Sequence, residues 1–530
     1  MGSPRAVAPV DAILEALAAV PILAGVDAAT LRRLAAHFDH VEVRSGTIVI
    51  RQGDPGDSFY VVRSGLLEVL REPTGGRIRL LRPGAPFGEL ALLSGTERVA
   101  TVRAVRDTEL WRLPHEAFVE LLGTDAQFAR MMVHALAQLV VESKAPTDAG
   151  HPRPRVFALL PLHEGAPTTP VLEVFASSFD DAVLCRESDA GPPAGWGRTV
   201  EHLEHVGRHV VLVASHDRGN WFAFCMREAD RSIAVARADA SFEPLPDDVR
   251  PDLLLFGRSA PGSTRRAVAT LSARAHHVVI GDERDAIARA LRRASGRSVG
   301  LVLSGGGARG LAHVGAYQAL LDAGVAVDRT GGTSMGALVA ALIASGSDPH
   351  HMRDVLHREL VLRRPFSDYG VPRASLIRAQ RGRLLLDRLF GTMVIEDLPL
   401  DFFCISADLT SAETIVHRHG LVSGALGASM SLPGVAPPVP DGGRLLVDGG
   451  VLDNLPVETM TTRDEGPVIA VDVIARGIPR QRRASARRHP QLPSIVDTLA
   501  RSATLASRGR ADRQRALAAM VVTPDLQDVG

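Results

Sequence analysis

The apolar and polar positions along the chain follow three different rhythms. From about residue 47 to 81, short apolar runs alternate with glycine-containing turns, which predicts the short strands of a small β-barrel or jelly roll. From about residue 150 to 297, apolar runs alternate with helix-like stretches, and this rhythm predicts βα units with a parallel sheet. A third stretch, from about 298 to 475, mixes strands, glycine-rich turns and helices. The pattern therefore predicts a multidomain chain.

The expected elements can be stated by range. In the first stretch, strands are expected at 47–50, 59–62, 66–70 and 77–81, with helices at 11–19, 27–37, 116–122 and 126–142. In the second stretch, strands are expected at 156–160, 182–185, 210–213, 233–236, 253–256 and 277–280. The turn after the first of these, Pro161 to Ala166, is not a phosphate-binding loop of the G-x-x-x-x-G-K-[ST] type, so no nucleoside triphosphate site is predicted.

A candidate nucleophile lies in the third stretch. Gly332-Thr-Ser334-Met-Gly336 follows the apolar run 325–327 and precedes 335–344, which is typical of a helix. A strand, a tight turn and a helix form the context in which G-x-S-x-G makes a nucleophile elbow. The two glycines let the chain bend sharply, so the hydroxyl of Ser334 is presented at the end of the sheet. The alternative is a glycine-rich turn with an idle serine.

The glycine run upstream has two interpretations. Residues 299–303 predict a buried strand, and Gly305, Gly306, Gly307, Arg309 and Gly310 open a helix that reaches about residue 321. This spacing fits a dinucleotide-binding turn, and the acidic residue 328 ends the next expected strand. It also fits an oxyanion loop, whose bare amides converge on developing negative charge beside a cationic arginine. We favour the oxyanion loop, because the serine elbow occupies the place of a ribose and no second mononucleotide half follows.

Asp448 is the candidate general base. It follows the apolar run 445–447 and is released into a turn by two glycines. A partly buried carboxylate near the serine could accept its proton if desolvation raises its pKa. The histidines of this region lie in no turn after a strand, and Asp441, in a second Asp-Gly-Gly, is expected in a hairpin turn. The histidines are His313, His350, His351, His357, His417 and His419.

These motifs together resemble the patatin-like phospholipase family. The order G-G-G-x-R-G, G-T-S-x-G and a late D-G-G followed by Asn454-Leu-Pro456 matches that family, as does the stretch 428–434 with two prolines just after it. The resemblance covers roughly residues 298 to 475. It implies a three-layer α/β/α fold and a Ser334–Asp448 dyad acting on lipid acyl esters. It further implies an oxyanion loop at 305–310, with no metal and no cofactor required for catalysis.

The first stretch carries a second set of chemical groups. Residues 87–104 predict a short helix whose amides can hold a phosphate, with Arg98 to neutralise it and Glu89 to accept a ribose hydroxyl. With the turn at 53–60, this resembles a cyclic-nucleotide-binding domain. By that resemblance, amides near Gly88, Ala91 and Val99 complete the cradle, and the valine favours cAMP. The alternative is a domain that has lost its ligand and is kept for folding or assembly.

Composition and charge set the remaining expectations. The chain is 45% hydrophobic with a formal net charge of +0, so nothing draws it as a whole to nucleic acid. Its cysteines are scattered in apolar segments, which indicates a reducing compartment. The N-terminus lacks a signal-type pattern, and no run approaches about 18 apolar residues, so a cytoplasmic protein is predicted. The arginine-dense stretch 476–488 is either a solvated loop or a transient contact with an anionic membrane.

The expected domains are an N-terminal helix (1–20), a cyclic-nucleotide-binding domain (21–142) and an α/β spacer (150–297). A patatin-like hydrolase domain (298–475) and a C-terminal tail with a helix at 494–508 (476–530) follow. This order resembles the neuropathy target esterase branch, in a form without that branch's N-terminal membrane helix. It implies a lysophospholipase or phospholipase acting on lipid, with cAMP as a candidate regulatory ligand. The alternative is a cyclic-nucleotide-responsive scaffold protein with a vestigial hydrolase domain.

Overall fold

The computed structural model describes eleven stretches of the chain. They are residues 32, 35–71, 76–125, 128–129, 153–206, 209–246, 249–257, 260, 262–371, 375–474 and 505–526. The chain divides into two compact units, one made of 1–165, 179–234 and 245–250, the other of 166–178, 235–244 and 251–530. The helices expected at 11–19, 27–37 and 126–142 lie almost wholly outside the described residues, as does the basic stretch 476–488.

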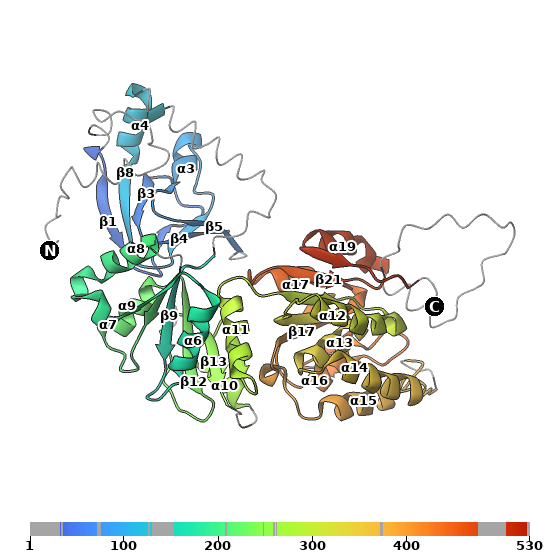
Figure 1. The fold of residues 1–530 in the computed structure, drawn as a ribbon. Helices are drawn as coiled ribbons and strands as arrows, with labels where there is room; N and C mark the ends of the chain where they lie inside the picture. The colour runs from blue at the N-terminus through green and yellow to red at the C-terminus, as the bar shows by residue number, and fades with distance from the viewer. Residues whose placement is uncertain are drawn as a thin grey trace. The chain divides into compact units, whose positions relative to one another are not determined.

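The first stretch folds as a β-roll of two antiparallel sheets, as predicted (Figure 1). One sheet has the order β1 (Asp39–Val43), β8 (Thr108–Pro114), β3 (Ser58–Ser64), β6 (Pro86–Phe87). The other has the order β2 (Ile48–Ile50), β7 (Thr101–Ala104), β4 (Leu67–Arg71), β5 (Gly76–Leu81). The short helix α3 (Glu89–Ser94) follows β6, and α4 (His115–Thr124) follows β8.

The β-roll is held together by both faces of β3. Phe59 and Val61 pack with Trp111 in one apolar cluster, while Tyr60 and Val62 belong to a second cluster. This division follows from the strand itself, because successive side chains of a β-strand point to opposite faces. The apolar run 59–62 is therefore buried on both faces of the strand.

The second stretch forms a six-stranded sheet with the order β10-β11-β9-β12-β13-β14. The strands are β9 (Val156–Pro161), β10 (Ala182–Arg186), β11 (His209–Val213), β12 (Arg231–Arg237), β13 (Asp252–Phe256) and β14 (Ala275–Val279). Pairs β10/β11, β11/β9 and β13/β14 are parallel. The intervening helices are α6 (Thr168–Ser178), α7 (Glu187–Ala190), α8 (Trp196–Val206), α9 (Asn220–Glu228), α10 (Ser263–Thr270) and α11 (Glu283–Ala294). The predicted βα units are confirmed.

The third stretch forms an eight-stranded sheet with the order β19-β20-β17-β16-β15-β21-β22, and β18 pairs with β17. The strands are β15 (Gly300–Leu303), β16 (Arg329–Thr333), β17 (Asp401–Asp408), β18 (Thr414–His417), β19 (Val439–Asp441), β20 (Arg444–Asp448), β21 (Val468–Val471) and β22 (Met520–Val522). The helices are α12 (Ala312–Asp322), α13 (Met335–Ala344), α14 (Pro349–Leu356), α15 (Gln380–Phe390), α16 (Val422–Ser429), α17 (Val457–Thr461) and α19 (Leu505–Ala516).

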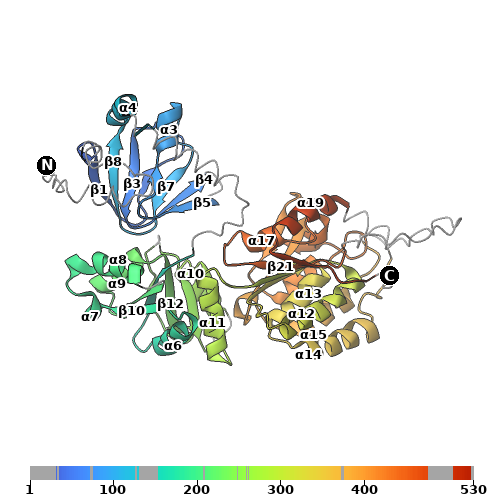
Figure 2. The ribbon, with the colours of Figure 1, turned by 45° about the horizontal axis from the view of Figure 1, so that its top comes forward.

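Helices cover both faces of this sheet, which gives the expected three layers. Figure 2 shows α12, α13, α14 and α15 on one side of the sheet and α17 and α19 on the other. The two apolar cores follow strand alternation: Leu301 and Leu303 of β15 pack on the α13 side, whereas Val302 packs on the α17 side. Helix α13 is buried along its whole length, so it forms the centre of the larger core.

Two segments differ from the sequence prediction. The strand expected at 325–327 lies later, at β16, whose sequence Arg-Thr-Gly-Gly-Thr has no apolar run. The reason is close packing, because a Cβ at Gly331 would lie 2.2 Å from the ring of Phe403 on β17. At the other end of the chain, β22 pairs in parallel with β21, so the sheet takes its edge strand from beyond residue 475. The described helix there, α19, begins near the end of the range expected for one.

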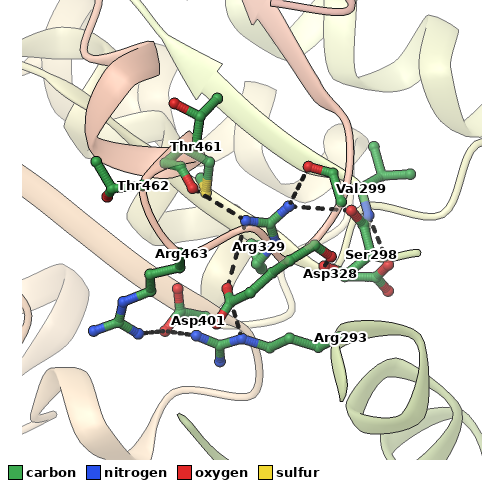
Figure 3. A network of polar contacts seen from close by, with 12 residues as sticks. Arg293, Ser298, Val299, Asp328, Arg329, Asp401, Thr461, Thr462 and Arg463 are labelled. Atoms are coloured by element: carbon green, nitrogen blue, oxygen red, sulfur yellow. Dashed lines mark hydrogen bonds and ion pairs between the residues drawn. The ribbon is translucent and has the colours of Figure 1, made fainter. Parts of the chain in front are cut away.

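A network of buried ion pairs lies at the amino ends of the central strands (Figure 3). Arg293 at the end of α11 reaches Asp401 at 3.1 Å and Glu465 at 2.9 Å. Arg329 at the start of β16 donates to the carbonyl of Ser298 at 3.1 Å and lies 3.5 Å from Glu465. Arg274 also reaches Glu465, at 3.0 Å. The network therefore ties α11 to the amino end of the eight-stranded sheet.

Candidate active site

Ser334 lies at the sharp turn between β16 and α13. Its φ is 56° and its ψ is −123°, a backbone conformation that residues with a side chain rarely adopt. The flanking glycines make the turn possible, because a Cβ at Gly332 or Gly336 would lie 2.5 or 2.4 Å from the carbonyl oxygen of Leu303. The serine is therefore held in a strained turn at the amino end of a buried helix, as the elbow prediction requires.

Asp448 is brought to the serine by the register of β17. Thr333 of β16 pairs with Ile405 of β17, and Asp448 of β20 pairs with the next residue, Ser406. Strand β16 runs parallel to β17, and β20 runs antiparallel to it. The residue after Thr333 and the last residue of β20 thus reach the same level of the sheet. Ser334 and Asp448 therefore lie side by side, and the Ser334 hydroxyl lowers the pKa of the Asp448 carboxyl group.

The carboxyl group of Asp448 is desolvated but not isolated. The residue is 4% exposed, and its Oδ1 accepts the N–H of Gly450 at 2.8 Å. Burial raises the pKa of Asp448 to about 6, against the smaller opposing effects of the hydrogen bonds from Ser334 and Gly450. A carboxylate with this pKa is ionised near neutral pH and is a stronger base than an exposed aspartate.

Two serines that the sequence did not assign a role hold this pair in place. The Oγ of Ser429 accepts the N–H of Ser334 at 3.0 Å, and the carbonyl of Ser431 accepts the N–H of Asp448 at 2.8 Å. Both residues lie in the stretch 428–434, which matched the patatin-like pattern without suggesting a chemical role. Sequence alone could not find this function, because it depends on contacts about 20 to 100 positions away along the chain.

The glycine loop follows β15 and runs beside the elbow. The N–H of Gly305 donates to the carbonyl of Asn454 at 3.1 Å, and the side chain of Asn454 donates back to the carbonyl of Gly305 at 3.1 Å. The N–H of Gly305, one of the expected oxyanion donors, thus has a backbone acceptor in this structure. Gly306 has an extended φ of −172°, and Gly307 is left-handed at 55°. The amides of these two glycines are the better candidates.

The rest of the loop is positioned by packing. A Cβ at Gly310 would lie 2.3 Å from the side chain of Met335, the residue after the serine, so this glycine lets the loop approach the elbow closely. Arg309 is exposed. Asp328, which the dinucleotide interpretation needed at the end of a strand, instead precedes β16 and pairs with Arg292.

The other candidate bases lie elsewhere or have other partners. His313 is buried with its Nε2 2.8 Å from the carbonyl of Ser304, and burial lowers the pKa of His313 to about 4. His417 lies on β18 with its Nε2 2.7 Å from the Oγ of Ser406. Asp441 is exposed and ends β19 at the hairpin that leads into β20, as predicted. The remaining histidines, His350, His351, His357 and His419, lie on α14, at its end, or on the loop after β18.

The residues expected to bind a cyclic nucleotide lie in the β-roll. Arg98 and Glu89 are both buried, at 4% and 3% exposure. The guanidinium of Arg98 donates to the carbonyls of Gly88 and Ser58, both at 2.9 Å, and to Asp57 at 2.8 Å. Gly88 caps α3 with a left-handed φ of 88°. Ala91 is buried, and Val99 is 59% exposed. The structure thus brings Arg98 to the start of α3, with internal acceptors around its guanidinium.

Comparisons with known proteins match both the eight-stranded sheet region and the β-roll. The profile of the patatin-like phospholipase family matches residues 301–461, and that of the cyclic nucleotide-binding domain matches residues 40–125. Lysophospholipase nte1 of Emericella nidulans is 27% identical, over 84% of this chain and 36% of its own length. The Thermus thermophilus catabolite activator protein is 32% identical over 23% of this chain and 59% of its own, with a TM-score of 0.22 that carries no weight here.

A mycobacterial relative extends the match to nearly the whole chain. An uncharacterised NTE family protein of Mycobacterium tuberculosis is 34% identical over 97% of this chain and 92% of its own length. The alignment therefore includes the β-roll, the six-stranded sheet and the eight-stranded sheet. The chain belongs to the NTE (neuropathy target esterase) family, and its third stretch is a patatin-like phospholipase domain.

Proposed function

We propose that the chain hydrolyses acyl esters of lysophospholipids or phospholipids, with Ser334 as the nucleophile and Asp448 as the general base. The observation that carries the proposal is the strand register that places Ser334 beside Asp448, a buried carboxyl group whose pKa burial raises to about 6. The strained turn at Ser334 and the adjacent glycine loop support the same reaction.

The reaction follows from these positions. Asp448 accepts the hydroxyl proton as the Oγ of Ser334 attacks the acyl carbon, and the carbonyl electron pair moves onto oxygen. The amides of Gly306 and Gly307 stabilise that oxyanion. When the tetrahedral species collapses, the leaving alkoxide takes the proton from Asp448. Water, deprotonated by the same carboxylate, then attacks the acyl-serine ester. The bond between the acyl carbon and the Oγ of Ser334 breaks, Ser334 takes the proton back from Asp448, and the fatty acid is released.

A fluorophosphonate probe tests the nucleophile directly, because it forms a covalent bond only with an activated serine. Wild type should be labelled and should release fatty acid from lysophosphatidylcholine, whereas Ser334→Ala should show neither, with turnover lower by at least about 10³-fold. Ser411→Ala, at an exposed serine of the same domain, should keep both. A folded wild type that is inert to the probe would favour the scaffold alternative.

A second function is supported in the β-roll. We propose that it binds a cyclic nucleotide, cAMP in particular, with Arg98 facing the phosphate and Glu89 the ribose, and that binding changes hydrolysis. The burial of both charged groups beside α3 supports this proposal. Arg98→Ala should weaken cAMP binding by about 1.5–3 kcal/mol, the scale of a hydrogen bond to a charged group.

Isothermal calorimetry distinguishes the outcomes. Arg103→Ala, which removes a half-exposed arginine paired with Glu68 in the same domain, is the matched control and should bind cAMP like wild type. An absence of cAMP heat in wild type would refute binding. Equal turnover with and without saturating cAMP would refute regulation while leaving binding intact.

A further inference from the structure

The segment 361–371 of the catalytic domain exposes large apolar side chains one after another. Val361 is 47% exposed, Leu362 67%, Phe366 42%, Tyr369 69% and Val371 80%. A single exposed apolar residue is ordinary on a protein surface, whereas a contiguous group marks an interaction site. These five lie within eleven consecutive residues, so they form one surface feature.

An apolar groove adjoins this segment. It encloses about 330 Å³ between α12 and α14, and its lining includes Leu311, Val314, Leu356 and Val361. Val361 thus belongs to both the groove and the exposed segment. At its other end the groove begins at Leu311, directly after the glycine loop. The lining of the groove therefore runs from Leu311, the residue after the glycine loop, to Val361, the first residue of the exposed segment.

The exposed segment lies in a part of the sequence that is rich in arginine. Between residues 353 and 388 the sequence contains nine arginines and four acidic residues, although the whole chain has a formal net charge of +0. Glu359 alone is approached by three guanidiniums, those of Arg358, Arg363 and Arg388 at 3.5, 2.8 and 2.7 Å. These three arginine side chains are each 41% to 56% exposed, so one buried carboxylate leaves a surplus of positive charge facing solvent.

The segment is also fixed relative to the catalytic pair. The amides of Leu376 and Ile377, just beyond it, donate to the carbonyls of Gly434 and Val435 at 3.0 and 2.9 Å. Three residues before Gly434, the carbonyl of Ser431 holds the N–H of Asp448. The stretch 431–435 therefore holds both the candidate general base and the residues that follow the exposed segment.

From these features we propose that the catalytic domain docks on a phospholipid surface that carries anionic headgroups. The docking face consists of Val361, Leu362, Phe366, Tyr369 and Val371, with the groove beside them and the half-exposed guanidiniums of Arg358, Arg363 and Arg388. Its apolar side chains enter the acyl boundary, and the guanidiniums pair with headgroup phosphates. The proposal rests on the proposed lipid hydrolysis and adds the surface from which the substrate is taken.

Vesicle sedimentation in the Ser334→Ala background tests the docking face without requiring turnover. The full chain should bind vesicles of phosphatidylcholine mixed with phosphatidylglycerol, and binding should weaken in high salt or with phosphatidylcholine alone. Leu362→Asp combined with Val371→Asp should lower the partition coefficient at least about tenfold, because two apolar contacts are lost and two negative charges face the anionic headgroups. Both positions are well exposed, so folding should be unaffected, as an unchanged melting temperature would show.

The matched control places the same charges elsewhere. Val206→Asp with Met520→Asp changes residues that are 71% and 54% exposed and should leave sedimentation unchanged. Wild-type-like binding of the docking-face variant would overturn the proposal, and so would an absence of binding by the parent. Binding lost only when the arginines of 476–488 are neutralised would assign the contact to that stretch, which also overturns it. None of these outcomes depends on whether Ser334 is a nucleophile.

Discussion

The two ends of the eight-stranded sheet each bury a carboxyl group, but the pKa values of these groups shift in opposite directions. At the carboxyl end of β16, Asp448 is buried with no ion-pair partner among the described residues, and its pKa is raised to about 6. At the amino ends of β15, β16 and β17, Glu465 is just as buried but lies among several guanidiniums. Burial alone would raise the pKa of Glu465, yet Arg293 and Arg274 outweigh it and hold that pKa below its usual value.

This difference separates reactivity from stability. A carboxylate without a cation remains basic enough to accept a proton, and its desolvation is a cost to the folded state. A carboxylate surrounded by arginines has no such basicity, and its removal leaves unpaired buried charge. We therefore expect substitutions at the carboxyl end to change chiefly activity, and substitutions at the amino end to change chiefly stability.

Asp448→Asn should have the largest effect on activity. An amide cannot accept the hydroxyl proton, so kcat/KM should fall by about 10³-fold or more. The same change removes a desolvated charge, so the melting temperature at pH 8 should rise by roughly 2–4 °C for each kcal/mol gained. Asp441→Asn, in the exposed hairpin, should leave kcat/KM within about twofold of wild type. Equal losses in both variants would mean that the dyad assignment is wrong.

Glu465→Gln should have the largest effect on stability. It leaves Arg293, Arg274 and Arg329 without their shared carboxylate, and breaking a buried pair in this way costs about 3–5 kcal/mol. Urea unfolding followed by circular dichroism would measure the loss, while kcat of the folded fraction should change little. A variant that is as stable as wild type but loses kcat would erase the distinction between the two ends.

The pH dependence should also separate the two ends. Asp448 must be ionised to act, so kcat/KM should rise with pH to a plateau above its pKa of about 6. The pKa of Glu465 is lowered on folding from its ordinary 4.5, so its contribution to stability is present above that value. This contribution is lost as the pH falls through the folded-state pKa.

Asp453→Asn is the control for the activity profile. Burial also raises the pKa of Asp453 to about 6, but its carboxylate accepts from Gln514 at 2.9 Å and from the N–H of Leu455 at 3.2 Å. The acid limb of kcat/KM should persist in this variant. If the limb disappears, Asp453 and not Asp448 is the group that titrates.

Ser429→Ala should produce the smallest effect. It removes the acceptor of the Ser334 N–H, a hydrogen bond worth about 0.5–1.5 kcal/mol, and so loosens the strained elbow. We expect a fall in kcat of roughly 2- to 13-fold by that measure, with KM little changed, whereas Ser429→Thr should restore much of the rate. A rate equal to wild type in Ser429→Ala would mean that the glycines alone fix the elbow.

The sequence by itself determined the elements that depend on local pattern. Short apolar runs separated by glycine-containing turns predicted the strands of the β-roll. Apolar runs that alternate with helix-like stretches predicted the strands of the six-stranded sheet. Glycine spacing predicted the elbow at Ser334, since the turn excludes side chains on either side. Asp448 was chosen as the candidate general base because it ends an apolar run and is followed by two glycines. Histidine is the more usual base, but no histidine of this region lies in such a turn.

Only the tertiary structure decided what depends on neighbours distant in sequence. Strand β16 has no apolar run, and its glycines are explained by the ring of Phe403 on the next strand. The N–H of Gly305 donates a hydrogen bond to the carbonyl of Asn454. Strand β22 joins the eight-stranded sheet from beyond residue 475, where the domain was expected to end. Burial raises the pKa of Asp448, whereas nearby arginines lower the pKa of Glu465 despite its burial. Local sequence fixes backbone conformation, whereas packing and desolvation arise only when distant segments meet.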